Sequence, residues 1–275
     1  MKRFRLLLSG LCALALPPGM ATAASSPWFE TQGGGVRLVV LPEEPDGAIP
    51  ALLDIKLEPG WKTYWRDPGQ SGISPSITFS EGSGLTLQSV GFPVPKQFDD
   101  GFTRYAGYDR SVALPLTLRR TGAPSEGGDI SASIFLGVCK NICIPVQADL
   151  SVGVKAARTT DPVEKAIVAA AVAALPAAPS PGFTVTDAHW NKAGDVLMVS
   201  FTAPEPTTER PLQVFVSGPP GYQFDTSSTP VREGDAYRIE VPLRYRPKSA
   251  NLADGDFLFT AESGGKTLEM QLAID

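Results

Sequence analysis

Sulfur-containing and metal-binding side chains are scarce in this 275-residue chain. It has three cysteines, four methionines and a single histidine, His189, with no second histidine or cysteine near it in the sequence. The chain also lacks a Ser-His-Asp set, a phosphate-binding loop and a dinucleotide-binding fingerprint, which argues against the common hydrolases and nucleotide-dependent enzymes. Beyond the first 23 residues no stretch of about 18 apolar residues occurs, so the sequence predicts no transmembrane helix there.

The first 23 residues have the pattern of a secretion signal. Basic residues lie within the first five positions, an apolar run covers 6–16, and 21–23 reads Ala-Thr-Ala, a small-x-small cleavage site. We therefore predict that residues 1–23 form a signal peptide and that the mature, exported chain begins near Ala24. Cleavage removes Cys12 and leaves one pair of thiols in a compartment where disulfides persist, by our prediction the bacterial periplasm.

Acidic residues outnumber basic residues. The whole chain has a net charge of −5, and without the three cations of the signal segment 21 basic residues face 29 acidic ones, which gives −8. A negative surface argues against binding to nucleic acid or to anionic lipid. The 27 glycines, the 26 prolines and the short alternating apolar segments between turns are typical of all-β sandwiches.

The alternating segments form two groups. We predict a first β-sandwich over 24–156, a linker with one Ala-rich α-helix over 157–181, and a second β-sandwich over 182–275. The predicted strands of the first group are 36–41, 51–57, 61–65, 112–118, 130–138 and 146–154. Those of the second group are 196–201, 212–216, 237–241, 257–261 and 268–274.

One segment has a clear helical pattern. Asp161 can cap its N-terminus, Pro162 suits the first helical position, alanine dominates the segment, and Pro176 ends it. We expect this helix to pack between the two domains rather than on a membrane. Its predicted packing side consists of Ile167, Ala171 and Leu175.

The two remaining cysteines occupy equivalent positions on neighbouring predicted strands. Cys139 and Cys143 have odd numbers, whereas the apolar positions of both strands are even. Because side chains alternate along a strand, we expect both sulfurs on the face away from the core. The loop 140–142 brings the two residues opposite each other, with Cβ atoms about 4.5–5.5 Å apart, close to disulfide range. Three-residue loops usually need one positive φ, and Asn141 tolerates it.

Three interpretations of the cysteine pair are open. So small a ring removes little entropy from the unfolded chain, about 2 kcal/mol, and a core of this size needs such help less than a mini-protein does. A tight, partly exposed ring stays reducible, and Lys140 beside the thiols favours the thiolate, which indicates a redox switch. The second interpretation is a structural disulfide. The third is Cu(I) bound by the two thiolates, although Met198, Met270 and His189 all lie in the other half of the chain.

Several motifs together resemble a known family. They are 60–72 (GWKTYWRDPGQSG), 98–108 (FDDGFTRYAGY), 114–116 (LPL) and 139–145 (CKNICIP). In combination they are similar to the periplasmic N-terminal domain of the thiol:disulfide interchange protein DsbD, and most of all to its ScsB-like branch. The similarity covers about 28–154, and the helix and second sandwich are less specifically similar to the extended N-terminal region of that branch.

The resemblance implies immunoglobulin-like sandwiches and a cysteine pair that carries electrons. Cys139 and Cys143 match the redox pair of the family, with a tighter spacing than in its best-known members. In the family a membrane-embedded domain reduces this pair, which then reduces periplasmic thioredoxin-fold proteins, and no cofactor is required. The chain contains neither that membrane region nor the C-terminal thioredoxin-like domain, so we expect a membrane-embedded electron donor that is encoded separately.

The family also has a cap loop that shields the disulfide, and residues 98–108 occupy the corresponding place. Aromatic side chains can cover sulfur, and acidic ones can raise a thiol pKa or pass a proton. The predicted cap residues are Asp99, Asp100, Phe102, Tyr105 and Tyr108. The alternative is an ordinary β-loop whose aromatic side chains fold into the core. Packing, rather than chemistry, is also our interpretation of Trp61, Tyr64 and Trp65.

The function that these observations predict is thiol:disulfide exchange, as in a protein-disulfide reductase. One cysteine attacks a partner disulfide and the other resolves the mixed disulfide. Cys143 is the favoured attacker, because Pro145 leaves its strand edge less tightly paired. The alternatives are a non-catalytic periplasmic binding module with a structural disulfide, and a Cu(I)-binding protein.

Overall fold

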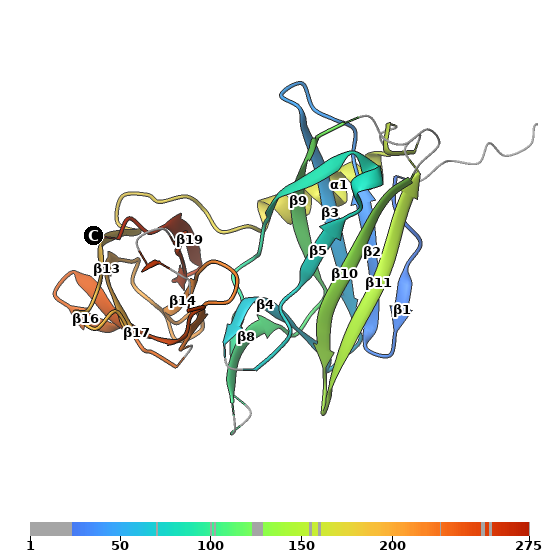
Figure 1. The fold of residues 1–275 in the computed structure, drawn as a ribbon. Helices are drawn as coiled ribbons and strands as arrows, with labels where there is room; N and C mark the ends of the chain where they lie inside the picture. The colour runs from blue at the N-terminus through green and yellow to red at the C-terminus, as the bar shows by residue number, and fades with distance from the viewer. Residues whose placement is uncertain are drawn as a thin grey trace, which may run out of the picture.

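Strands dominate the structure. The computed structural model describes residues 24–69, 71–99, 101, 103–122, 129–153, 156–158, 161–225, 227–248, 251–252 and 255–274. In these residues it confirms the predicted all-β class, with two β-sandwiches side by side and the helix α1 (Pro162–Ala173) against the first of them (Figure 1). The domain boundaries themselves remain predictions.

The first sandwich consists of two facing sheets. Its elements are β1 (Phe29–Thr31), β2 (Gly34–Val40), β3 (Ala48–Leu57), β4 (Lys62–Gly69), β5 (Ser76–Phe79), η1 (Glu81–Ser83), β6 (Leu85–Val90), β7 (Lys96–Asp99), β8 (Arg104–Tyr108), β9 (Val112–Arg120), β10 (Asp129–Cys139), β11 (Cys143–Gly153) and η2 (Ala156–Arg158). One sheet has the strand order β1-β2-β3-β9-β6. The other has the order β11-β10-β4-β8-β7, and β5 pairs with β10 beyond the end of β4.

Alternation along β10 and β11 fixes which side chains enter the first core. The two strands form an antiparallel hairpin in which Ile134 lies opposite Ala148 and Leu136 opposite Val146. These even-numbered side chains are all buried, whereas Ser133 and Gln147 on the other face are exposed. Because the alternation continues to the end of the hairpin, it also decides the direction of the cysteine side chains.

The second sandwich has its own core. Its strands are β12 (Thr184–Trp190), β13 (Val196–Thr202), β14 (Gln213–Ser217), β15 (Gln223–Phe224), β16 (Val231–Glu233), β17 (Ala236–Tyr245), β18 (Leu258–Ser263) and β19 (Lys266–Gln271). One sheet has the order β12-β13-β17-β15 with β16 added to β17, and the other has the order β14-β18-β19. Leu197, Val199 and Phe201 alternate into the core between them.

Helix α1 packs on the outer face of the first sandwich. Its N-cap is Asp161, whose side chain accepts a hydrogen bond from the Val163 backbone N–H, as the sequence predicted. The buried side of the helix consists of Glu164, Val168 and Ala171. Of the packing side predicted from the sequence, Ala171 is buried and Ile167 is partly buried against the same cluster. The cluster contains Val168 and rests on Val39, Leu41 and Leu52 of the first sandwich.

The two sandwiches meet at β4. The Trp65 ring packs against Phe215 of β14 with centroids 5.6 Å apart. The next residue, Arg66, donates from one guanidinium nitrogen to both carboxylate oxygens of Glu269 of β19, at 3.0 and 3.2 Å. Thr260 donates to the same carboxylate at 2.8 Å. A buried ring contact and a charged contact therefore join the second sandwich to a central strand of the first.

Candidate functional site

The cysteine pair closes the β10–β11 hairpin. Cys139 and Cys143 lie opposite each other in the strand register and form a disulfide, with Cα atoms 4.2 Å apart. In the loop between them the Lys140 backbone N–H donates to the Ile142 carbonyl at 3.2 Å. The prediction of a positive φ at Asn141 is wrong, because every described residue with a positive φ is a glycine.

The two sulfur-bearing residues differ in their exposure to solvent. Cys139 is 6% exposed, whereas Cys143 is exposed. Cys139 does not belong to the first core but to a small separate cluster with Tyr64, Tyr105 and Phe98 on the opposite face of the sheet. This position agrees with the side-chain alternation of β10. The disulfide therefore joins a buried residue to an exposed one.

Tyr64 touches both sulfurs. Its hydroxyl oxygen lies 2.8 Å from Sγ of Cys139 and 2.9 Å from Sγ of Cys143. Because disulfide sulfurs carry no hydrogen, the tyrosine is the donor in this state. The sequence analysis missed this role by treating Tyr64 as a packing residue. No local pattern indicates this role, because Tyr64 shares a face with Cys139 only through the pairing of Lys62 with Cys139, which joins distant segments.

Two glycines hold the Tyr64 ring in place. A Cβ atom at Gly137 would lie 2.9 Å from a ring carbon of Tyr64. A Cβ atom at Gly72, whose φ is +128°, would lie 2.5 Å from the opposite edge of the ring. Any larger residue at either position would occupy space that the ring fills. The tyrosine is thus fixed between two backbone segments, with its hydroxyl at the disulfide.

Lys62, Phe98 and Tyr105 extend the aromatic cover. Lys62 lies opposite Cys139 in the strand register, and its ammonium donates to the Tyr105 hydroxyl at 3.1 Å. The same ammonium lies 4.4 Å from the centroid of the Phe98 ring, a cation–π contact. Tyr105 stacks on Phe98 at 5.3 Å and meets Tyr64 edge-on at 5.6 Å. Phe98 and Lys62 were not among the predicted site residues.

The predicted cap loop is mainly a β-hairpin. Residues on both sides of its turn pair in register, from Lys96 opposite Gly107 to Asp99 opposite Arg104. Tyr105 lies beside Cys139, as the cap hypothesis requires. Asp100 and Phe102, which were also predicted as cap residues, lie outside the described residues.

The other two predicted cap residues lie away from the sulfurs. Tyr108 belongs to the first core, and its hydroxyl donates to the Pro93 carbonyl at 2.8 Å. Tyr108 is therefore a core residue and not part of the cap over the disulfide. The reason is that residues three positions apart on a strand, such as Tyr105 and Tyr108, face opposite sides of the sheet. Burial raises the pKa of Tyr108, so the phenol stays protonated. Asp99 turns back into its own hairpin: the Gly101 backbone N–H and then Arg104 lower its pKa, and it is a poor proton donor.

Within the described ranges, no group of three or more His, Cys, Asp and Glu side chains is arranged to hold a metal ion. In the same ranges, no helix has both the length and the apolar character needed to cross a membrane.

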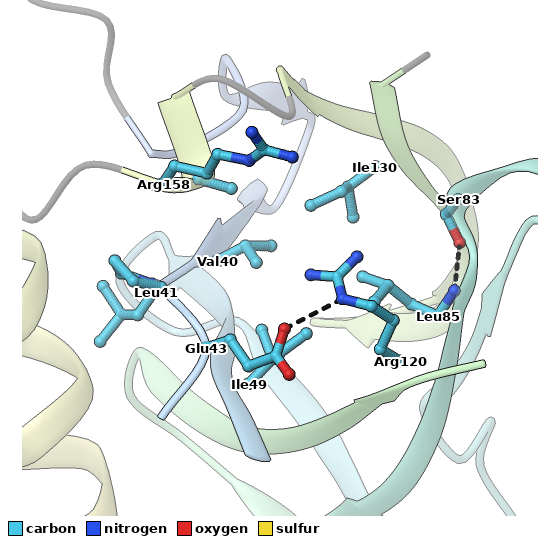
Figure 2. Close-up of a pocket in the computed structure, with 11 residues that line it drawn as sticks. Val40, Leu41, Glu43, Ile49, Ser83, Leu85, Arg120, Ile130 and Arg158 are labelled. Carbon is cyan, nitrogen blue, oxygen red and sulfur yellow. Dashed lines mark hydrogen bonds and ion pairs between the residues drawn. The ribbon is translucent and has the colours of Figure 1, made fainter. Parts of the chain in front are cut away.

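A cavity opens at the other end of the first sandwich. Its volume is about 500 Å³, and an ion pair between Glu43 and Arg120, with N and O 2.9 Å apart, lies at its edge (Figure 2). Ile130 lines this cavity near the start of β10, whereas Cys139 ends the same strand. At about 3.3 Å per residue the two lie roughly 30 Å apart, so the cavity does not take part in the disulfide site.

Comparisons with known proteins agree on the first sandwich. Residues 38–154 match the family described as thiol:disulfide interchange protein DsbD, N-terminal. The chain is also similar to the crystal structure of the N-terminal periplasmic domain of ScsB from Proteus mirabilis, with a TM-score of 0.69 and 19% identity over 92% of this chain and 98% of that one. At this identity the similarity shows the fold alone.

Two further solved structures give no support of this kind. The E. coli chaperone DraB matches with a TM-score of 0.20 and 12% identity over 86% of this chain and 97% of that one. A marsupial T cell receptor matches with a TM-score of 0.20 and 8% identity over 74% of this chain and 97% of that one. These scores are too low to carry an argument. The comparison with curated proteins finds no match.

The family match spans the strands that build the site. It begins within β2, ends just after β11, and includes the disulfide with its aromatic cover. The match and the Cys139–Cys143 disulfide together support chemistry of the thiol–disulfide exchange type. The first sandwich of this chain is a DsbD N-terminal-like domain.

Proposed function

We propose that the protein is a periplasmic thiol:disulfide exchange protein that passes electrons through Cys139 and Cys143. The observation that carries the proposal is the asymmetry of the pair. Cys143 is open to a partner, whereas Cys139 is 6% exposed beneath aromatic rings, and the Tyr64 hydroxyl contacts both sulfurs. A structural bond requires neither an accessible sulfur nor a hydroxyl donor beside it.

Reduction of the pair begins at the accessible sulfur. A thiolate of the electron donor attacks Sγ of Cys143, the Cys139–Cys143 bond breaks, and Cys139 leaves as a thiolate. Tyr64 donates a hydrogen bond to this leaving sulfur from 2.8 Å, which stabilises the negative charge that develops there. A second donor thiolate then attacks the donor sulfur of the mixed disulfide and releases Cys143. The donor is oxidised to a disulfide, and this chain gains two electrons.

Reduction of an acceptor reverses these steps. The Cys143 thiolate attacks one sulfur of the acceptor disulfide and forms a mixed disulfide, and the other acceptor sulfur leaves as a thiolate. Cys139 then attacks Sγ of Cys143, restores the internal disulfide and releases the reduced acceptor. Because β11 is an edge strand, Cys143 can meet a partner without displacing a neighbouring strand. Edge position and exposure both support Cys143 as the attacking residue.

Partners are proposed from the family match and from the similarity to the ScsB domain, whose title calls it periplasmic. The electron donor is a membrane-embedded protein encoded separately, and the acceptors are periplasmic thioredoxin-fold proteins. A cleaved signal peptide brings the chain to that compartment. Tyr105 and Phe98 shield Cys139 until a partner docks, so they take the part of the family's cap.

Trapping of the mixed disulfide tests the proposal. In Cys139→Ala the attacking thiolate remains and the resolving one is absent, so this variant should accumulate disulfide-linked complexes with periplasmic partners. Cys143→Ala is the matched control and should accumulate far fewer, because Cys139 is shielded. Non-reducing gel electrophoresis and mass spectrometry of the complexes provide the measurement. If neither variant ever traps a partner, the exchange function is wrong.

Two further measurements separate the alternatives. A reduction potential below about −300 mV would favour a structural disulfide. Stoichiometric Cu(I) binding that disappears in Cys139→Ala would favour copper carriage.

Tyr64→Phe retains the ring and removes the hydroxyl, and it should slow exchange by about tenfold to a hundredfold, because a hydrogen bond to a charged group is worth about 1.5–3 kcal/mol.

A further inference from the structure

The first described residue is held firmly in the first sandwich. Ala24 is 1% exposed, and its carbonyl oxygen accepts a hydrogen bond from the Val40 backbone N–H at 2.9 Å. The next residue, Ser25, forms an antiparallel bridge with Val39. The chain at Ala24 therefore runs beside the end of β2, and these contacts fix the position of its backbone nitrogen.

That nitrogen faces a buried carboxylate. The Ala24 N–H donates to Oε2 of Glu164 at 3.1 Å, and Glu164 is 5% exposed on the first turn of α1. A glutamate three residues after an N-cap usually reaches back to the N–H of the cap, in a capping box. Here the Asp161 carboxylate caps Val163, and Glu164 extends to a chain segment 140 positions away. Local capping thus does not explain its direction.

A neutral amide compensates a buried carboxylate poorly. Burial of an ionised carboxyl group is costly unless a charge and several hydrogen bonds balance it, and a peptide N–H supplies one donor and no charge. An α-ammonium at the same place supplies a positive charge and more donors. Its ordinary pKa of about 7.7–8.0 keeps it protonated at pH 7. The sequence independently places a small-x-small cleavage site at 21–23, directly before Ala24.

We infer that cleavage of the bond between Ala23 and Ala24 creates an α-ammonium that forms a buried ion pair with Glu164. Hydrolysis by a signal peptidase adds one water molecule, which leaves a carboxylate on Ala23 and the ammonium on Ala24. The new ion pair joins the edge of β2 to α1, which otherwise rests on the first sandwich through apolar contacts such as that of Val168. The signal-bearing precursor has an amide at this place and lacks the ion pair. Removal of the signal therefore completes the fold.

The first experiment determines the mature N-terminus. The full chain is exported from a bacterial host, and the product is measured by intact mass and N-terminal sequencing. A chain that begins at Ala24 is expected. A product that begins at any other residue overturns the inference, because its ammonium would lie away from Glu164.

The second experiment isolates the ion pair. Glu164→Gln is made in the chain that begins at Ala24 and in a chain that carries Gly-Ser-Gly before Ala24, where the nitrogen remains an amide. We expect the substitution to lower the Tm of the first chain by about 5 °C and that of the extended chain by much less. Glu58→Gln, at an exposed position of the first sandwich, is the matched control and should change neither. Equal losses in both chains at Glu164 overturn the inference.

A third measurement needs no substitution and so does not depend on the folding of a variant. Acetic anhydride is applied to the native chain at pH 7, and the acetylated amines are located by mass spectrometry. The α-amine of Ala24 should resist acetylation until the chain unfolds, whereas the exposed lysines react. Acetylation of this amine at the rate of an exposed amine contradicts the inference.

Discussion

The two sandwiches have the same architecture and differ in what their outer faces carry. Each buries an apolar core between two sheets. At the end of the first sandwich the outer face holds a disulfide beneath aromatic rings. On the second sandwich, β17 instead presents Arg238, which pairs with Glu240 at 2.5 Å and is partly exposed. The proposed redox chemistry therefore depends on a few outward side chains, and the fold supplies only their positions.

The two regions are also connected through a single strand. On β4, Tyr64 touches the sulfurs, the next residue, Trp65, packs on Phe215, and the one after that, Arg66, pairs with Glu269. The second sandwich thus fastens the strand that carries the hydroxyl donor. The comparison suggests one sandwich for chemistry and one for support, and this division can be tested at the contact between them.

Loss of the Arg66 charge should have the largest effect. The Arg66 and Glu269 side chains are 15% and 23% exposed, and Arg66 also lies over the Phe92 ring at 4.8 Å. In Arg66→Ala the Glu269 carboxylate stays partly buried without its cation, so the free energy of unfolding should fall by about 3 kcal/mol. Urea denaturation followed by tryptophan fluorescence provides the measurement.

The matched control uses an ion pair within the second sandwich. Arg232 and Glu205 are 52% and 71% exposed. Because exposed pairs contribute little, Arg232→Ala should change the free energy of unfolding by less than about 0.5 kcal/mol. If the free energy of unfolding falls by a similar amount in the two variants, the contact between the sandwiches stabilises the protein no more than an exposed ion pair does.

Two buried or partly buried aspartates should give opposite pH dependence. Asp67 lies in the first sandwich, and burial raises its pKa from 3.8 to about 6. The backbone N–H groups of Gly69 and Phe224 act in the opposite direction and lower this pKa, but their effect is smaller. The folded state therefore holds this proton more tightly than the unfolded state. The contribution of Asp67 to the free energy of unfolding is therefore largest below about pH 4. It falls by up to about 3 kcal/mol as the pH rises to about 6.

Substitution of this residue tests that sign. Asp67→Asn removes the ionisation, so the free energy of unfolding should no longer fall between about pH 4 and pH 6. Asp225 in the second sandwich is the counterpart: burial raises its pKa, but Ser227 and Arg244 lower it overall. Its contribution is present at neutral pH and is lost as the pH falls through its lowered pKa. The measurement is denaturation of the wild-type chain and of both asparagine variants across pH 3–7. The difference in free energy of unfolding between wild type and variant gives the contribution of each aspartate. If the two contributions change with pH in the same direction, the assignment is contradicted.

Sequence alternation was sufficient for much of the fold. The even-numbered apolar positions of β10 and β11 and the N-cap at Asp161 all follow from local pattern. The same rule placed both cysteines outside the core. These features could be predicted because each depends on neighbouring residues and on the two-residue period of a strand.

Contacts between distant segments could not be predicted in this way. The region around Tyr105 was treated as a loop, so the rule that separates it from Tyr108 was not applied. Tyr64 was assigned to packing because nothing local shows that β4 pairs with β10 beside Cys139. The contact of Glu164 with Ala24 spans 140 positions. The only local pattern around Glu164 is that of a capping box, and that pattern predicts a different hydrogen bond.

A local effect should follow from one added methyl group at the site. Gly137→Ala places a Cβ atom 2.9 Å from the Tyr64 ring and 3.0 Å from Cβ of Ile73, so the ring must move. Overpacking of this kind costs about 1–3 kcal/mol, and displacement of the hydroxyl from the sulfurs should slow disulfide exchange by about tenfold.

Reduction of the disulfide by excess dithiothreitol, followed by tryptophan fluorescence, provides the rate for this variant. Gly122→Ala is the control, because no atom within 4 Å would contact the added Cβ there. It should reduce at the wild-type rate. If Gly137→Ala also reduces at that rate while losing stability, the glycine serves only packing, and Tyr64 does not need its present position to assist the leaving sulfur.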